Sequence, residues 1–287
     1  MQITPIFEKD AEGTVKNTYD DLKKALQTHS LPVFFSYIGP FPEYLTYISE
    51  QLIQNLNNAR FSVLIDDAFE QFKTVIQSEL TDSSDKTKWL QKYSHSPSFY
   101  YFEKDLQHIF KTNIKLCLIF IALREAVKGW AVAAKQIKSN IGEEVKQSTQ
   151  VNSSIATQII FDVEELSNEV QISTTQQYNL PTEPGNQLAM ADQSALERNL
   201  LPEYLQICRN DFGELLKQER VLLARVSIEK LLLSYIGLFP SLVFSPINVV
   251  LELTSKYDNF YELLYLLSEH FPTFAVQRMM FSGYMMK

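Results

Sequence analysis

Ser36–Pro42 reads SYIGPFP and Ser234–Pro240 reads SYIGLFP, so the two stretches agree at six of seven positions. They lie 198 residues apart, counted from Ser36 to Ser234. Chance is a poor explanation, because the shared residues include tyrosine, glycine and proline. We interpret the stretches as landmarks of a duplicated unit. A duplicated chain often places its working groove between its halves, so the sequence predicts two similar parts with a site along their seam.

Charge and cysteine content narrow the functional classes. The 287 residues carry a formal net charge of −8 and no run of lysine or arginine, which argues against a nucleic-acid partner. Two cysteines, Cys117 and Cys208, have no metal-like spacing and are too few for a disulfide framework. We therefore expect no metal site, and the composition fits a reducing, cytoplasmic compartment.

Two segments bear on membranes. Met1–Asp10 carries acids where the apolar core of a secretory signal would be needed, so we expect no signal peptide. Leu231–Leu251 has no charged residue and reaches the roughly 20 residues of a spanning helix. Pro240 and Pro246 interrupt it, and we expect a buried core segment rather than a membrane span.

Helical periodicity dominates the chain. Between Phe61 and Ile76 the apolar residues recur at spacings of 3, 4, 7 and 8, the pattern of one stripe on an amphipathic helix. Pro42 is typical of a first helical position, and so is Pro97 after Ser96. The first of these helices runs through Leu56, and the second through Ile109. Strand-like alternation is scarce and hairpin turns are missing, which predicts an all-α fold.

The composition divides the chain into three parts. Residues 1–138 form the predicted N-terminal helical repeat, with a nearly continuous apolar helix from Ile114 to Lys138 at its centre. Residues 139–194 are rich in Gln, Ser, Thr and Asn and read as a polar linker with a short helix at Ile159–Val170. Residues 195–287 form the shorter C-terminal repeat, with one helix expected to start at Ser245-Pro246 and another at Tyr257–His270. The prediction is two tandem repeats that form a pseudo-dimer.

Standard catalytic signatures are missing from the sequence. We find no nucleophile elbow, phosphate loop or zinc-binding motif, and the four histidines lie far apart. Within the repeated stretch, Gly39 and Gly237 are explained by close packing or a turn. Tyr37 and Tyr235 are less readily explained, because a buried tyrosine needs a partner for its hydroxyl. A pair of tyrosines related by a pseudo-two-fold axis could line a cavity.

Several stretches of the first half resemble a known family, the group I 2-haloacid dehalogenases. They are Tyr19–Leu26, Leu31–Phe35, Phe41–Leu45, Asn113–Ile119 and Ala122–Gly129. The segment at Asn113 is similar to the family's Asn-Pro-Lys-Leu-Leu, with Ile114 in place of proline. The second half resembles the family only through Tyr235–Pro240.

The resemblance implies an all-helical pseudo-dimer without a cofactor. In such enzymes an aspartate activates water, an asparagine positions it, and water displaces halide from C2 without a covalent intermediate. Asn113 matches the positioning asparagine. The aspartate belongs just before the second Ser-Tyr-Ile-Gly, where this chain has Leu231–Leu233. The nearest acid is Glu229, and Arg225 four residues earlier could hold it in an ordinary ion pair on the helix surface.

The resulting hypothesis is a haloacid-dehalogenase-like protein with an inter-repeat pocket for a small organic acid. Phe34, Tyr37 and Tyr235 would line the pocket. A cofactor-free hydrolase would use Asn113 to orient water and Glu229 as its base. The alternative is a non-catalytic helical interaction module or pseudo-enzyme that kept the fold and lost the base. A homodimer is compatible with either.

Overall fold

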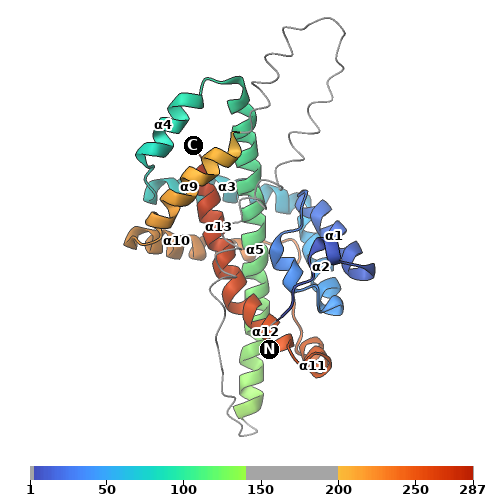
Figure 1. The fold of residues 1–287 in the computed structure, drawn as a ribbon. Helices are drawn as coiled ribbons and strands as arrows, with labels where there is room; N and C mark the ends of the chain where they lie inside the picture. The colour runs from blue at the N-terminus through green and yellow to red at the C-terminus, as the bar shows by residue number, and fades with distance from the viewer. Residues whose placement is uncertain (1–2, 140–199, 287) are drawn as a thin grey trace, which may run out of the picture.

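The computed structural model describes residues 3–139 and 200–286, and no strand occurs within these ranges (Figure 1). The first half contains η1 (Glu8–Asp10), α1 (Gly13–Leu26), η2 (Val33–Tyr37), α2 (Pro42–Leu56), α3 (Ala59–Glu79), α4 (Ser84–Tyr93) and α5 (Pro97–Ser139). The second half contains α9 (Leu201–Leu215), α10 (Glu219–Ile236), α11 (Ile247–Lys256), α12 (Phe260–Tyr265), the π-helical η3 (Leu266–His270) and α13 (Phe271–Met285). The predicted all-α class is confirmed.

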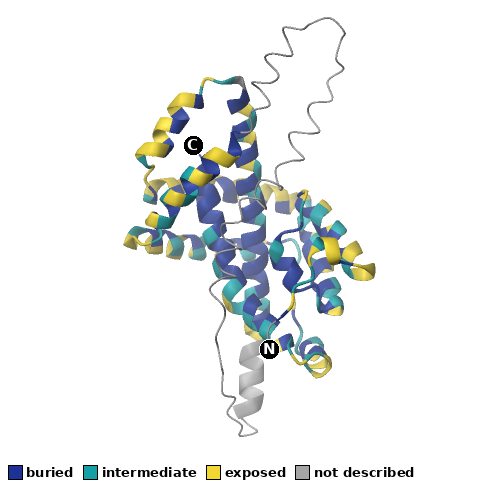
Figure 2. Cartoon of the chain, viewed as in Figure 1, coloured by how far each residue is buried: buried dark blue, intermediate teal, exposed yellow. Residues whose placement is uncertain are grey.

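An antiparallel pair, α5 and α13, forms the centre of the molecule (Figure 1). Asn113 contacts Arg278, and seven residues further along α5 the ring of Phe120 contacts that of Phe271, seven residues earlier on α13. The contacts run in opposite order along the two helices, which fixes their antiparallel direction. Both helices are almost entirely buried where they meet (Figure 2). The one stretch of the described residues that is long and apolar enough to cross a bilayer, Ser98–Gly129, lies mostly inside this core.

Elements of the two halves of the chain pack directly on one another. α1 and α2 lie on one side of the central pair, whereas α9 and α10 lie on the other (Figure 1). The Tyr44 hydroxyl on α2 lies 3.1 Å from the Ser245 hydroxyl, which precedes α11. The ring of Phe41 contacts that of Phe260 at a centroid distance of 5.3 Å. The two halves therefore share one hydrophobic core.

Local signals located several helix starts correctly. Pro42 is the first residue of α2, Pro97 is the first residue of α5, and α11 begins directly after Pro246. The predicted stripe of α3 faces the core from Phe61 to Ile76. One difference concerns α5, which runs unbroken where the sequence indicated separate helices up to Ile109 and from Ile114. Residues 110–113 continue the helix because Phe110, Thr112 and Asn113 are buried in the same core.

The expectation of a wholly buried Leu231–Leu251 segment is wrong in part. The segment comprises the end of α10, a loop and the start of α11, so it is not one helix. Leu232 and Tyr235 are buried, but Leu238 is 67% exposed and Leu242 is 63% exposed. The proline-containing loop cannot keep one face against the core, and its apolar side chains alternate between core and solvent.

The sequence analysis placed no helix after His270, yet α13 follows directly and carries half of the central pair. Pro272 has no N–H group to donate to the carbonyl of Ser268 and its ring would clash there in a regular α-helix. The chain adopts the wider π-helical geometry at Leu266–His270, which spans this point. The helix therefore continues through a proline that would ordinarily end it.

The two copies of the repeated stretch end helical segments, but they differ in detail. Pro42 begins α2, whereas Pro240 lies in a loop and begins no helix. A Cβ atom on Gly39 would lie 2.1 Å from the Tyr19 hydroxyl oxygen, whereas on Gly237 its nearest neighbour would be 3.5 Å away. The tandem-repeat division at residues 138 and 195 stays a prediction, and the linker helix at Ile159–Val170 lies outside the described residues.

This difference predicts unequal effects of alanine at the two glycines. Gly39→Ala should lower the free energy of unfolding by about 1–2 kcal/mol, because the added methyl displaces the Tyr19 ring. The Tyr19 hydroxyl would then lose its 2.9 Å hydrogen bond to the Ile6 carbonyl. Gly237→Ala is the matched control and should leave stability nearly unchanged. Equal losses in urea unfolding would show that the close approach at Gly39 is unimportant.

Candidate functional site

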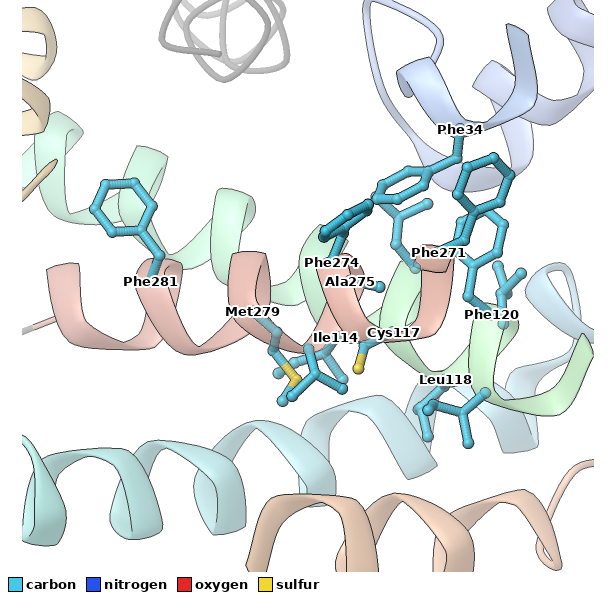
Figure 3. Packing of buried hydrophobic residues seen from close by; sticks show 14 of the residues in the cluster. Phe34, Ile114, Cys117, Leu118, Phe120, Phe271, Phe274, Ala275, Met279 and Phe281 are labelled. Carbon is cyan, nitrogen blue, oxygen red and sulfur yellow. The ribbon is translucent and has the colours of Figure 1, made fainter. Parts of the chain in front are cut away.

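Aromatic side chains from both halves meet at one end of the seam between α5 and α13. Ring centroids of Phe34 and Phe120 are 4.6 Å apart, and those of Phe34 and Phe271 are 5.4 Å apart. Tyr37 joins the group through Phe271 at 5.9 Å. Figure 3 shows Phe34 approaching Phe120 and Phe271 from the first-half segment above them. Phe34 and Tyr37, two of the predicted pocket residues, are therefore neighbours of the central helix pair.

A buried polar pair lies about two helical turns along the same seam. The Nε atom of Arg278 donates a hydrogen bond of 2.7 Å to Oδ1 of Asn113. Both residues are only 1% exposed. The Nδ2 group of Asn113 is buried and has no hydrogen-bond acceptor. A charged guanidinium and an unsatisfied amide in the protein interior are both costly, so this pair is the strongest sign of a site in the described chain.

Helix periodicity explains why these residues share one seam. Asn113, Cys117 and Phe120 are spaced by four and three residues and so project from one face of α5. Arg278 and Phe271 have the matching seven-residue spacing on α13. Cys117 lies between the polar pair and the aromatic group, and burial raises the pKa of its thiol. A thiol kept neutral by burial is a packing residue and not a nucleophile.

Tyr235 has other neighbours. Its hydroxyl donates a 2.5 Å hydrogen bond to Oδ2 of Asp67 on α3, and its ring contacts Phe72. Burial, and then the Asp67 carboxylate, raise the pKa of Tyr235. Burial also raises the pKa of Tyr37, whose ring contacts Phe271 instead. The two tyrosines of the repeated stretch therefore lie in different chemical surroundings.

Glu229 makes the helix-surface ion pair that the sequence offered as the alternative to a catalytic role. Nε of Arg225 lies 3.0 Å from Oε1 of Glu229, and another nitrogen of Arg225 donates to the Thr273 hydroxyl on α13. The Glu229 side chain is 33% exposed. Its charge also contributes to raising the pKa of Cys117, so it lies on the α5 side of α10. No described carboxylate hydrogen-bonds to Asn113.

Two residues of chemical interest were missed by the sequence analysis. Arg278 lies on the helix that was not predicted, and no local signal marks it. Asp105 on α5 is buried, and burial raises the pKa of its carboxyl to about 7. Asp105 lies eight residues before Asn113, which corresponds to about 12 Å along the helix. That separation excludes direct contact between the two side chains.

The described residues contain no group of three His, Cys, Asp or Glu side chains that could hold a metal ion. Two surface pockets lie away from the polar pair. One of about 350 Å³ is lined by residues including Asp82 and Tyr284, and one of about 400 Å³ by residues including Lys23 and His29. Neither contains Asn113 or Arg278.

Solved structures share this architecture. A D-2-haloacid dehalogenase mutant in complex with D-2-CPA matches with a TM-score of 0.63 and 14% identity, over 100% of this chain and 95% of that one. A second D-2-haloacid dehalogenase mutant matches with a TM-score of 0.63 and 13% identity, over 99% and 94% of the two chains. No protein-family model matches the sequence, and no curated protein does. The resemblance seen in the sequence is thus confirmed at the level of structure: this chain has the D-2-haloacid dehalogenase fold, in a strongly diverged sequence.

Proposed function

We propose that this protein binds a small organic acid at the seam between α5 and α13, where the Arg278 guanidinium and the Asn113 amide receive the carboxylate. The observation that carries the proposal is the buried Nδ2 of Asn113, which has no acceptor, beside a buried arginine. A carboxylate supplies both an acceptor for the amide and a negative charge for the guanidinium. Phe34, Phe120 and Phe271 would then contact the apolar part of the acid.

The proposed site is closed in the described conformation, because Asn113 and Arg278 are each 1% exposed. An acid must therefore enter through a transient opening along the seam. The wider π-helical turn of η3 lies next to Phe271 and offers a place where the α13 side of the seam can shift. The two haloacid dehalogenase structures support the kind of ligand, since one was solved with D-2-CPA.

We propose binding without dehalogenation. A general base must lie within hydrogen-bond reach of its water, and Leu231–Leu233 stand where the family resemblance places the aspartate. Glu229 is the nearest replacement, but it is paired with Arg225. The oxygen of Asn113 that would orient water accepts a hydrogen bond from Arg278. Without a cofactor to supply other chemistry, the acid would be held and not hydrolysed.

The test compares acids with a neutral isostere. Addition of 2-chloropropionate or propionate at about 100 times its Kd should stabilise the folded protein by roughly 2.7 kcal/mol, because the ligand binds only the folded state. Propionamide has nearly the same shape and no charge, and it should give no thermal shift. No halide should be released from 2-chloropropionate. A shift with propionamide equal to that with propionate, or no shift with any acid, would overturn the proposed site. Halide release that disappears in Glu229→Gln would identify a working base.

The second candidate function is a non-catalytic interaction module, and the exposed apolar side chains of α10 favour it. A pseudo-enzyme that retains the fold can serve both functions, because binding an acid in the core and binding a partner at the surface use different residues. We also propose that the two halves are eroded copies of one unit, since both copies of the repeated stretch end helical segments and bury their tyrosines.

A further inference from the structure

The outward surface of α10 is unusually apolar. Leu222, Leu223, Val226 and Leu233 are 59%, 58%, 52% and 46% exposed. Their positions follow one another at spacings that place them along one side of the helix, together with the exposed Glu219 and Lys230. We call these six residues the outer face of α10. In Figure 2 the helix lies at the margin of the molecule with exposed residues along it.

This surface is not needed for folding of the single chain. The opposite side of α10 packs against α3, α5 and α13 through buried residues, namely Val221, Ala224, Ile228, Leu232 and Tyr235. A surface helix normally has polar residues on its outer side, and a helix that is apolar all round is normally buried. Four large aliphatic side chains in one stripe therefore indicate a surface that is covered in the functional state.

We propose that a second copy of this chain covers the outer face of α10, in a two-fold symmetric dimer with the two α10 helices antiparallel. A two-fold axis that crosses the helix between Ala224 and Arg225 places Glu219 opposite Lys230 of the second copy. The same operation places Lys230 opposite Glu219 of the second copy. Leu222, Leu223 and Val226 then lie between these two ion pairs, in the middle of the interface.

The charges favour a second copy over an unrelated partner. Neither Glu219 nor Lys230 forms an ion pair or hydrogen bond with the rest of the described chain. They stand at opposite ends of the same stripe, about 16 Å apart along the axis of α10. One acid and one base at equal distances from the centre of an apolar stripe make the surface complementary to itself in the antiparallel arrangement. A single helix face is a small interface, so we expect a concentration-dependent equilibrium between monomer and dimer.

Sedimentation velocity over a range of protein concentrations tests the proposal. The wild-type protein should show a reversible dimer, and Val226→Asp should be monomeric, because it places two carboxylates near the symmetry axis. Leu251→Asp is the matched control, since Leu251 on α11 is 51% exposed and lies outside the outer face. This variant should dimerise as the wild type does. A monomeric wild type at the highest concentration that the protein tolerates, or a dimer unaffected by Val226→Asp, would overturn the proposal.

Charge reversal tests the antiparallel register itself. Glu219→Lys and Lys230→Glu should each raise the dimer dissociation constant by about tenfold, because like charges then face each other. The double variant with both reversals restores opposite charges and should dimerise like the wild type. Failure of the double variant to recover would exclude this register. The experiment is independent of the acid site, since none of these residues contacts Asn113 or Arg278.

Discussion

Asp82→Asn is expected to lower the free energy of unfolding by about 3 kcal/mol, because it leaves the buried ammonium of Lys86 without its counter-charge. The Lys86 side chain is 1% exposed. Its Nζ atom donates to Asp82 at 2.5 Å and to the backbone carbonyl of Tyr284 at 2.6 Å, and it lies 4.3 Å from the centre of the Tyr284 ring. The lysine thereby fixes the C-terminal end of α13 to α4. Asp82 is 48% exposed, so solvent screens part of the loss and the effect falls at the lower end of the range for buried pairs.

The neighbouring ion pair is the control for this prediction. Asp85 and Lys88 form a similar helical pair at 3.5 Å, but both side chains are more than 70% exposed. Asp85→Asn should therefore cost less than about 1 kcal/mol. Urea unfolding with an unchanged denaturant dependence measures both effects. Equal losses in the two variants would show that burial of Lys86 does not determine the strength of its pair.

Interactions within a few residues of the chain could be predicted from the sequence. The Arg225–Glu229 pair follows from their four-residue separation, and the start of α2 follows from Pro42. The fold class follows in the same way from apolar spacing within each helix. Such features depend on local geometry, which the order of residues determines directly.

Contacts between distant parts of the chain could not be predicted in this way. Tyr235 was expected in a pocket with Tyr37, but its hydroxyl bonds to Asp67, which lies 168 residues earlier. Arg278 was missed because Pro272 is a helix-ending signal, and only the π-helical turn before it allows α13 to form. Asn113 was singled out by family resemblance, and the residue that binds it is on the unpredicted helix. The candidate site therefore became visible only when α5 and α13 were seen side by side.

The pair formed by Asn113 and Arg278 gives the second large expected effect. Asn113→Leu should lower the free energy of unfolding by about 3 kcal/mol, because it leaves Nε of a fully buried guanidinium without its acceptor. Arg278→Met should also destabilise, since both polar groups of the Asn113 amide would then be buried without partners. Chemical denaturation of each variant measures these losses.

The double variant Asn113→Leu with Arg278→Met separates a structural role from a binding role. Replacing a buried polar pair by apolar residues of similar volume is often neutral or stabilising, so the double variant should regain most of the stability that each single change loses. It should nevertheless show no thermal shift with propionate, because the groups proposed to receive the carboxylate are gone. A double variant as unstable as the sum of its parts would mean that the two residues do not act as a pair. An acid-dependent shift that survives in it would place the bound carboxylate elsewhere in the protein. Recovered stability together with lost binding would mean that the chain keeps a costly polar pair in its core for the sake of its ligand.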